Sequence, residues 1–551
     1  MSANLSVEQS LMKAKSYSKK GDLAEAQKLY ETILKNFSNN IRAQQGLASL
    51  NKYKQNNVIQ NPPQESVNQL VNLYNQGQME TVIKQAEGLT AQYPGAYVVW
   101  NILGASREEI GMFDESIYAY KKAIFLKSDF ADAHFNMGVA LKNQGKLDEA
   151  IEAYKKSISL KPSRAEAYNN MGDTLYSQGK LDEAIEAYKK SISLKPDYAE
   201  AYYNMGLALH YLNKLDEAIE VYKKSISLKP DFAEAHYNLG FTLLKSGRLK
   251  EGLDESEWRW KNPEFLSNER NFIQPMWDGS QSLKDKRILL WSEQGIGDTL
   301  NWSSCLSFLD SQAKHCILEC QDKLVPLLQR SFPNVEVKSE DRSLDINRDD
   351  FDYHLPMGSL YRHFLSEITQ NTKPKAYLVP DPDRVNYWRE RLNSLGKGPY
   401  VGIGWKSTDM SPGRLPNYAP ILEWSPVLKI PDVTFINLQY KDFEDDLAKV
   451  KDKLGVTVHN FDELDQFNNV DDTTALCAAL DMLVSNHGTA PLISGAVGTP
   501  TKLANWKQSS WNTILNNPVG PLIDIYTRNT WETWDNVFRL IKEDILKINQ
   551  N

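Results

Sequence analysis

A spacing of 34 residues constrains the first half of this 551-residue chain more than any other feature. Each unit holds two amphipathic segments with helical periodicity; the first ends at a turn glycine and the second at Lys-Pro. Such a unit cannot bury its apolar face alone, so successive copies must stack. One glycine series keeps this interval at Gly104, Gly138, Gly172, Gly206 and Gly240. The turn glycines keep it too, with Asn213 substituting once.

This period, with small residues where the two helices cross, is the tetratricopeptide signature. Six consecutive units are predicted over residues 67–262, and a looser unit lies within residues 1–50. Residues 51–66 are polar, contain two prolines and predict a linker. The sequence therefore predicts an N-terminal all-α solenoid with a concave groove. A recurring tyrosine is expected in its core, at Tyr120, Tyr154, Tyr188 and Tyr222.

One asparagine series also keeps the interval, at Asn136, Asn170, Asn204 and Asn238. Asparagine is a mediocre helix former, yet each of these is expected in the middle of a helix. The four amides could form a ladder that binds an extended polypeptide, or they could bond neighbouring helices. The units ADAHFNMGVAL and AEAYNNMGDTL resemble the repeats of eukaryotic protein O-GlcNAc transferase. In that family the matching asparagine lines the groove, so the resemblance implies an acceptor-binding role.

After Asn262 the period stops, and short apolar strands alternate with helices. This pattern predicts two doubly wound parallel α/β units, over residues 263–380 and 381–551, joined through a helix at 381–396. Strands are predicted at 287–293, 315–321 and 335–339 in the first unit, and at 401–406, 433–440, 456–461, 482–486 and 500–505 in the second. Ligands of such folds bind outside the carboxyl ends of the strands.

Two strand-to-helix turns carry the most chemical information. In the first, Gly295 and Gly297 let a ligand approach the backbone, and Asp298 follows them. Asp298 is either a helix cap or a functional carboxylate. The second turn contains His487, Gly488 and Thr489 at a predicted helix start, where free N–H groups suit a phosphate. Its alternative is a polar turn in which Thr489 caps the helix.

The C-terminal half resembles bacterial tetratricopeptide-repeat glycosyltransferases, relatives of the lipopolysaccharide heptosyltransferases. The matching motifs are Glu-Trp-Arg-Trp at 257–260, Pro-Met-Trp-Asp-Gly at 275–279, Glu-Gln-Gly-Ile-Gly-Asp-Thr at 293–299, Gly-Ile-Gly-Trp-Lys at 402–406, Asn-Leu-Gln-Tyr at 437–440, Ala-Leu-Asp at 479–481 and Gly-Ala-Val-Gly-Thr-Pro at 495–500. The resemblance implies a GT-B pair of Rossmann-like domains, a nucleotide-sugar donor and metal-independent transfer with inversion. The base of the heptosyltransferases falls on Asp298.

The donor site implied by these motifs comprises Gly295, Gly297, Lys406, Gln439, Tyr440, His487, Gly488 and Thr489. At the phosphate turn, relatives usually carry Asp-Thr and a histidine four residues later, whereas this chain has His487, Gly488 and Leu492. Two functions are therefore weighed. One is a glycosyltransferase that modifies a protein held by the repeats, with a nucleotide-sugar as co-substrate and no cofactor. The other is a non-catalytic protein-binding scaffold with a degenerate transferase domain.

Composition excludes several other classes of function. The net charge of −8 and isoelectric point of about 5.7 argue against a nucleic-acid binder. No apolar run approaches the roughly 20 residues of a membrane helix, and the start lacks the apolar stretch of a signal peptide. The four cysteines are expected as buried core thiols rather than metal ligands. These features predict a cytoplasmic protein without a metal site.

Overall fold

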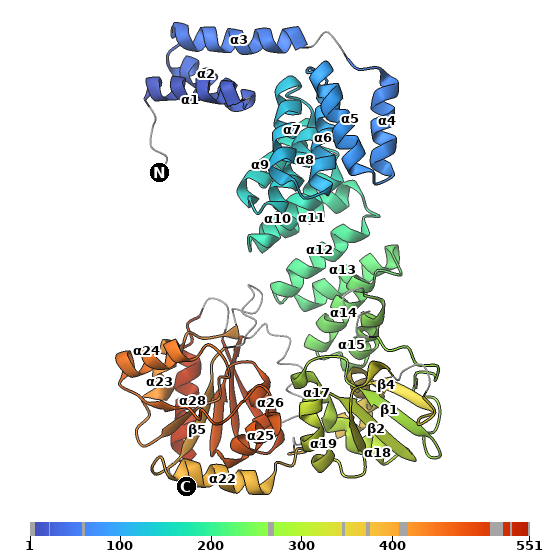
Figure 1. Ribbon diagram of the computed structural model, residues 1–551, viewed down its shortest axis with the longest axis vertical. Coiled ribbons are helices and arrows are strands. Elements are labelled where there is room, and N and C mark those ends of the chain that lie inside the picture. The colour runs from blue at the N-terminus through green and yellow to red at the C-terminus, as the bar shows by residue number, and fades with distance from the viewer. Residues whose placement is uncertain are drawn as a thin grey trace. The chain divides into compact units, whose positions relative to one another are not determined.

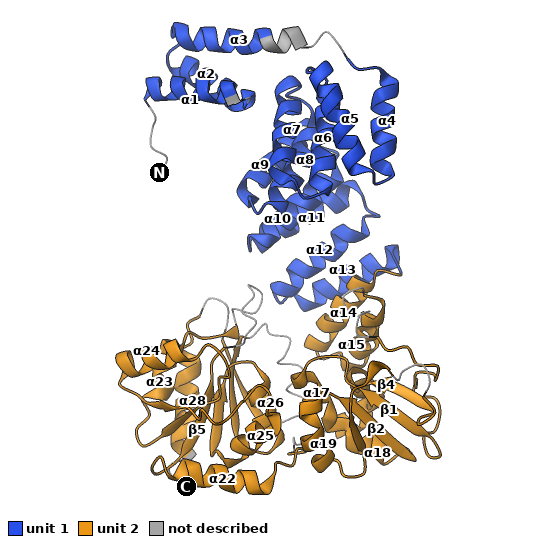
Figure 2. Ribbon diagram, in the orientation of Figure 1, with its two compact units in different colours: residues 1–230 blue, residues 231–551 orange. Residues whose placement is uncertain are grey.

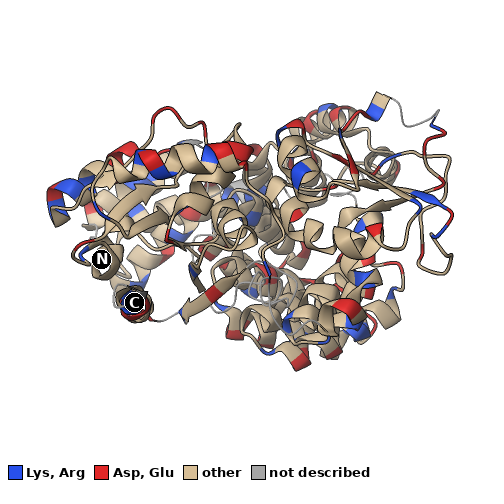
Figure 3. Cartoon of the chain, turned by 90° about the horizontal axis from the view of Figure 1, so that it is seen from below, with Lys and Arg blue, Asp and Glu red and all other residues tan. Residues whose placement is uncertain are grey.

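The computed structural model describes residues 6–20, 22–57, 61–262, 269–343, 348–370, 375–406, 417–506, 522–528 and 532–548. The chain forms two compact units, Met1–Pro230 and Asp231–Asn551 (Figure 2). The first is all helical, and the second contains both sheets (Figure 1). Figure 3 shows acidic and basic residues interspersed along the helices and loops.

Unit 1 is the predicted solenoid of helix pairs. Its helices are α1 (Val7–Lys20), α2 (Leu23–Asn36), α3 (Ile41–Asn57), α4 (Gln64–Asn75), α5 (Met79–Gln92), α6 (Tyr97–Glu109), α7 (Phe113–Leu126), α8 (Ala131–Asn143), α9 (Leu147–Leu160), α10 (Ala165–Ser177), α11 (Leu181–Leu194), α12 (Ala199–Tyr211) and α13 (Leu215–Leu228). The predicted linker at 51–66 is partly helical, because α3 continues to Asn57 and α4 begins at Gln64. Residues 58–60 lie outside the described residues.

A glycine–tyrosine contact explains two of the repeated positions. A Cβ added at Gly104 would lie 2.6 Å from the ring of Tyr120, so only glycine lets the ring approach this closely. The same contact recurs in the next three repeats between Gly138 and Tyr154, Gly172 and Tyr188, and Gly206 and Tyr222. The four tyrosines are buried, which confirms their predicted place in the core. In the turn that follows Gly206, Asn213 adopts a φ of 59°, the left-handed conformation that glycine takes in the other repeats.

The sixth helix pair belongs to unit 2 rather than to the rest of the solenoid. It comprises α14 (Ala233–Lys245) and α15 (Leu249–Ser256), followed by the short helix η1 (Glu257–Lys261). Arg362 donates to Asp254 of α15 over 2.7 Å, and Arg259 of η1 bonds to Glu293. These contacts fasten the last repeat to the first sheet, so the compact unit starts at Asp231 and not at the predicted boundary after residue 262.

The first sheet is parallel, with strand order β3-β2-β1-β4. Its strands are β1 (Arg287–Trp291), β2 (His315–Cys320), β3 (Glu336–Ser339) and β4 (Tyr353–Pro356). The helices of this half are α17 (Ile296–Trp302), η2 (Ser303–Cys305), α18 (Leu306–Asp310), η3 (Asp322–Leu324), α19 (Val325–Ser331), η5 (Met357–Ser359), α20 (Leu360–His363) and α21 (Leu365–Gln370). Three of the strands agree with the sequence prediction, and β4 was not predicted. All four cysteines are buried thiols, as expected.

The second sheet is parallel as well, with order β10-β9-β8-β5-β6-β7. Its strands are β5 (Tyr400–Gly404), β6 (Thr434–Asn437), β7 (Val458–His459), β8 (Met482–Ser485), β9 (Thr501–Trp506) and β10 (Ile523–Arg528), of which β10 was not predicted. Its helices are η7 (Ile421–Trp424), α23 (Ser425–Leu428), α24 (Glu444–Leu454), α25 (Val470–Ala479), α26 (Thr489–Ala496) and α28 (Asp535–Ile548), with α22 (Pro382–Asn393) preceding the sheet.

The chain direction across the second sheet reverses at β5. The chain moves outward from β5 through β6 to β7, then returns to the other side of β5 as β8. This is the Rossmann strand order, in which a crevice opens at the carboxyl ends of the two strands that flank the reversal. The C-terminal half is therefore an α/β region with two parallel sheets.

Candidate functional site

A pocket in unit 2 lies at the strand reversal of the six-stranded sheet. Gly404 at the end of β5 pairs with Ser485 at the end of β8, so the loops that follow leave the sheet side by side. The pocket is lined by Ile296, Gly404, Lys406, Leu438, Gln439, Tyr440, Gln466, Phe467, Val470, Thr473, Ser485, His487, Gly488, Thr489, Ala490, Pro491 and Ile493. Six of the predicted donor-site residues are thus brought together: Lys406, Gln439, Tyr440, His487, Gly488 and Thr489.

The buried side chain of Asn486 fixes the 485–489 turn to the neighbouring backbone. Asn486 donates to the carbonyl of Ala504 over 2.7 Å and accepts from the N–H of Ala419 over 3.1 Å. Helix α26 begins at Thr489 with Gly488 as its N-cap residue. Thr489 is therefore not the cap, and the corresponding interpretation is wrong. The N-terminus of α26, with its positive end and free N–H groups, faces the pocket through Thr489 and Ala490.

The charge of Lys406 is directed at a carboxylate. Its Nζ donates to Asp446 Oδ2 over 2.8 Å and to the carbonyl of Asp442, and Trp405 Nε1 donates to Asp446 Oδ2 over 2.9 Å. Burial disfavours ionised Asp446, but the bonds from Lys406 and Trp405 outweigh it and hold the pKa of Asp446 below its usual value. Lys406 therefore lines the pocket as one half of an ion pair.

Gln439 and Tyr440 have different surroundings. Gln439 is buried, and its Oε1 accepts the backbone N–H of Lys406 over 3.0 Å, so it braces the loop after β5. Tyr440 stacks on Phe467, with ring centroids 5.6 Å apart and planes 25° apart. Phe467 is 45% exposed, and Lys323 Nζ lies 4.1 Å from its centroid. Phe467 was not predicted; the only signal was an aromatic residue within the polar stretch DELDQFNN.

The glycine turn after β1 reaches the same pocket through one residue. Gly295 is the N-cap residue of α17, Ile296 lines the pocket, and α17 contacts α26. Asp298 is the third residue of α17, so it is not the helix cap, and that interpretation is also wrong. Gly297 lies in the same first turn. A Cβ at Gly295 would have no neighbour nearer than 3.7 Å, so the protein's own packing does not require this glycine.

A buried ion pair holds Glu293, the residue at the start of this turn. Arg259 donates to Glu293 Oε1 over 2.9 Å, to Glu257 Oε1 over 2.7 Å and to Ser359 Oγ over 2.9 Å. Burial raises the pKa of Glu293 to about 7 despite the arginine. A Cβ at Gly358 would lie 2.2 Å from Glu293 Oε1, so a glycine is needed there. The motif Glu-Trp-Arg-Trp thus anchors the end of β1.

The four repeated asparagines are half-buried in the solenoid. Asn136 Nδ2 donates to Asn101 Oδ1 over 3.2 Å, and Asn204 Nδ2 donates to Asn169 Oδ1 over the same distance. Asn238 Nδ2 donates to the carbonyl of Glu234 over 2.9 Å, and Asn170 Oδ1 accepts from Asn169. The amides therefore bond within the solenoid and still keep some surface exposed, so their role in acceptor binding stays a prediction.

The described residues contain no group of three or more His, Cys, Asp or Glu side chains placed to hold a metal ion. Nor does any helix described there have the length and apolar character needed to cross a membrane.

Comparison with known families identifies the repeats directly. A TPR repeat model matches residues 109–145, 140–177, 172–212 and 206–247, and a tetratricopeptide repeat model matches residues 10–40. The predicted repeats, including the looser first one, are thereby confirmed over these residues. A repeat array of this kind is suited to protein–protein interaction.

One curated relative is Protein FlbA of Caulobacter vibrioides, which is 33% identical over 307 residues. The match covers 52% of this chain and 51% of that protein, so the chain spans about half the length of this relative. Among solved structures, MamA is 30% identical, with 30% of this chain and 98% of MamA covered and a TM-score of 0.28. YrrB, described as a TPR protein with an unusual peptide-binding site, is 18% identical, with 33% and 94% covered and a TM-score of 0.29.

Proposed function

We propose that the chain is a glycosyltransferase whose repeats hold a polypeptide acceptor and whose C-terminal α/β half, a GT-B pair, binds a nucleotide-sugar. The observation that carries the proposal is the pocket at the strand reversal of the second sheet, into which Lys406, Tyr440 and the 487–489 turn converge. Crevices of this kind are where doubly wound folds bind nucleotides.

The diphosphate and the base of a nucleotide-sugar each have a counterpart in this pocket. The N-terminus of α26 offers N–H groups and a positive dipole end to the diphosphate, without a metal ion. The exposed ring of Phe467, stacked on Tyr440, offers a flat apolar surface for the base. Lys406 contributes positive charge to the lining of the pocket, although it does so while paired with Asp446.

Asp298 is the proposed general base. It is half-buried on α17, the helix whose first residue lines the pocket and which contacts α26. In an inverting transfer, the carboxylate takes the proton of the acceptor hydroxyl as that oxygen attacks the anomeric carbon and the nucleoside diphosphate leaves. A positioned base of this kind typically contributes about 10²–10⁴-fold to the rate.

Nucleotide binding tests the proposal. Isothermal titration of the full chain with UDP, GDP, ADP and CMP should show one nucleotide that binds. Phe467→Ala should weaken this binding by about tenfold, because base stacking is worth roughly 1–3 kcal/mol. Phe332→Ala, which removes a ring that packs against the hydrophobic core of unit 2, is the control for general loss of folding. If none of the four nucleotides binds at millimolar concentration, the transferase proposal fails.

One observation favours a second function, the non-catalytic scaffold. Lys406, the cation expected to meet the diphosphate, already has a carboxylate partner in Asp446. On this alternative the repeats bind a protein and the pocket stays empty of nucleotide. Asp446→Asn separates the two functions. It removes the charge that pairs with Lys406 and should strengthen nucleotide binding if the pocket is a donor site, and it should change nothing in a scaffold.

A further inference from the structure

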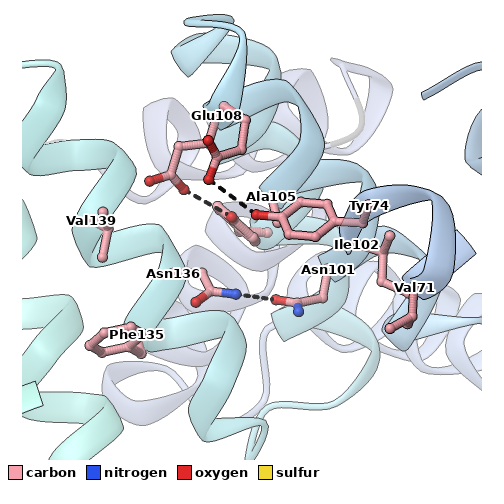
Figure 4. Close-up of a pocket in the computed structure, with 11 residues that line it drawn as sticks. Val71, Tyr74, Asn101, Ile102, Ala105, Glu108, Phe135, Asn136 and Val139 are labelled. Carbon is pink, nitrogen blue, oxygen red and sulfur yellow. Dashed lines mark hydrogen bonds between the residues drawn. The ribbon is translucent and has the colours of Figure 1, made fainter. Parts of the chain in front are cut away.

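A second pocket lies wholly within unit 1, between the first helices of successive repeats (Figure 4). It has a volume of about 380 Å³ and is bounded by residues of α4, α6, α7 and α8. Apolar side chains form one part of its wall: Val71, Ile102, Ala105, Phe135 and Val139. Tyr74, Tyr120, Asn101, Asn136 and the adjacent carboxylates Glu108 and Glu109 form the rest.

The two carboxylates are held by tyrosine hydroxyls rather than by cations. Tyr120 Oη donates to Glu108 Oε2 over 2.9 Å, and Tyr74 Oη donates to Glu109 Oε1 over 3.2 Å (Figure 4). The residues that line the pocket include no lysine, arginine or histidine. The basic residue beside them, Arg107, bonds instead to Glu87 over 2.7 Å.

The charge at this site is costly to the folded solenoid. Burial raises the pKa of Glu108 to about 7, and the neighbouring charge of Glu109 adds to the effect. Carboxylates that are withdrawn from water are usually paired with a cation. Glu108 is half-buried and Glu109 is exposed, and the residues that line the pocket supply no cation to either carboxylate.

The repeat does not need a carboxylate at this position. The residues that follow Glu108 at successive intervals of 34 are Lys142, Tyr176, His210 and Leu244. The helices that carry these four residues, α8, α10, α12 and α14, all form. The repeat that contains Glu108 also keeps the glycine–tyrosine contact, between Gly104 and Tyr120. Packing against Gly104 thus explains the tyrosine at position 120, but it does not explain the carboxylate of Glu108 that accepts a hydrogen bond from it.

The lining of the pocket suits a lysine or arginine side chain, because it has both apolar and acidic parts. Its aliphatic stem would lie against Ile102, Ala105 and Val139, in the way that such stems cover apolar surface. Its charged end would meet the two carboxylates in charge-assisted hydrogen bonds, which are stronger than neutral ones. The paired amides of Asn101 and Asn136 lie in the same pocket, where they can bond to the backbone of the segment that carries the side chain.

We propose that this pocket binds a cationic side chain, lysine or arginine, of an extended segment of a partner polypeptide. The proposal names the partner chemistry of the repeats. It rests on the part of the proposed function in which the repeats hold a polypeptide, and not on sugar transfer. Its test therefore uses no nucleotide-sugar, so that it can fail while the transferase proposal stands.

The experiment measures binding of short peptides to the full chain by saturation-transfer NMR titration. The probes are acetylated, amidated Ser-Ala heptapeptides whose central residue is lysine, arginine, norleucine or glutamate. The lysine and arginine peptides should bind at least about tenfold more tightly than the norleucine peptide, because a hydrogen bond to a charged group contributes roughly 1.5–3 kcal/mol. The glutamate peptide should bind least.

Two variants decide where the preference originates. Glu108→Gln with Glu109→Gln removes both charges, keeps acceptors for Tyr120 and Tyr74, and should abolish the preference for a cation. Glu220→Gln removes one charge from an exposed position of α13 and should leave the preference intact. Equal binding of the lysine and norleucine peptides, no binding of either, or a preference that survives in the double variant would each overturn the proposal.

Discussion

Arg259 Nε lies 2.9 Å from Glu293 Oε1, so the segment after the last repeat is bonded to the end of β1 through a buried ion pair. Removing one partner of such a pair typically costs about 3–5 kcal/mol, because the other charge remains buried. Arg259→Ala should lower the free energy of unfolding by that order in urea titrations followed by tryptophan fluorescence. Arg362→Ala breaks the half-exposed pair with Asp254 and should cost less than about 1 kcal/mol. Equal losses in the two variants would contradict the role given to Arg259.

The glycine–tyrosine contact predicts a substitution pattern within the repeats. A Cβ at Gly206 would lie 2.5 Å from the ring of Tyr222, so Gly206→Ala should destabilise the solenoid by about 1–3 kcal/mol. Gly88→Ala is the matched control: it lies in α5 with nothing within 4 Å, and should stabilise by about 0.5–1 kcal/mol. Circular dichroism melts of the two variants should therefore shift in opposite directions.

The raised pKa of Glu108 makes the stability of unit 1 depend on pH. Because its folded pKa of about 7 exceeds the ordinary value of 4.5, the folded state holds a proton that the unfolded state releases. This stabilisation is complete below about pH 4.5 and is lost as the pH rises through 7. Glu108→Gln should thus melt at a higher temperature than the wild type at pH 8, while the difference shrinks towards pH 5.

The groups around Glu108 set the sign of this effect. Glu109 lies on the same helix, Tyr74 projects from α4, Tyr120 from α7 and Tyr154 from α9, while the adjacent cation, Arg107, bonds to Glu87 instead. Glu220→Gln should show no pH-dependent difference from the wild type. A gain for Glu108→Gln that grows towards low pH would contradict the assignment.

Substitution of the repeated asparagines should weaken peptide binding without unfolding the solenoid. Changing Asn136, Asn170, Asn204 and Asn238 to alanine removes side-chain bonds worth about 1 kcal/mol each and should leave the solenoid folded. Binding of the lysine heptapeptide should weaken, because the amide of Asn136 lines the pocket beside Glu108. A collapsed melting temperature with unchanged binding in the folded fraction would show that the series is structural.

The repeats were predictable because the 34-residue spacing of glycine and tyrosine follows from the same packing contact in each repeat. The interval between Gly104 and Gly138 reflects one tyrosine contact per unit, and local sequence carries that information. Strand β4 was missed because its four residues, Tyr353–Pro356, end in a proline, which argues against a strand in the sequence. Its place in the sheet depends on pairing with β1, which is distant in the sequence.

The site was predicted less completely than the fold. Convergence of Lys406 and His487 follows from strand topology, which the alternation of strands and helices implies. The pairing of Lys406 with Asp446 and the exposed ring of Phe467 depend on loop conformation, which spacing does not encode. The caps were assigned one to three residues late, since Gly295 and Gly488 hold the positions predicted for Asp298 and Thr489.

The most direct test of the proposed transferase function is a rate of nucleotide release. The chain is incubated with hydroxyl-bearing peptides and UDP-, GDP-, ADP- or CMP-linked sugars. The released nucleoside diphosphate is measured, or CMP itself for the CMP-linked sugar. We expect turnover of one donor, a loss of about 10²–10⁴-fold in Asp298→Asn, and unchanged nucleotide binding by that variant. Since Asp298 is not the helix cap, Asn at this position should leave α17 folded. Release by Asp298→Asn at the wild-type rate would contradict the account.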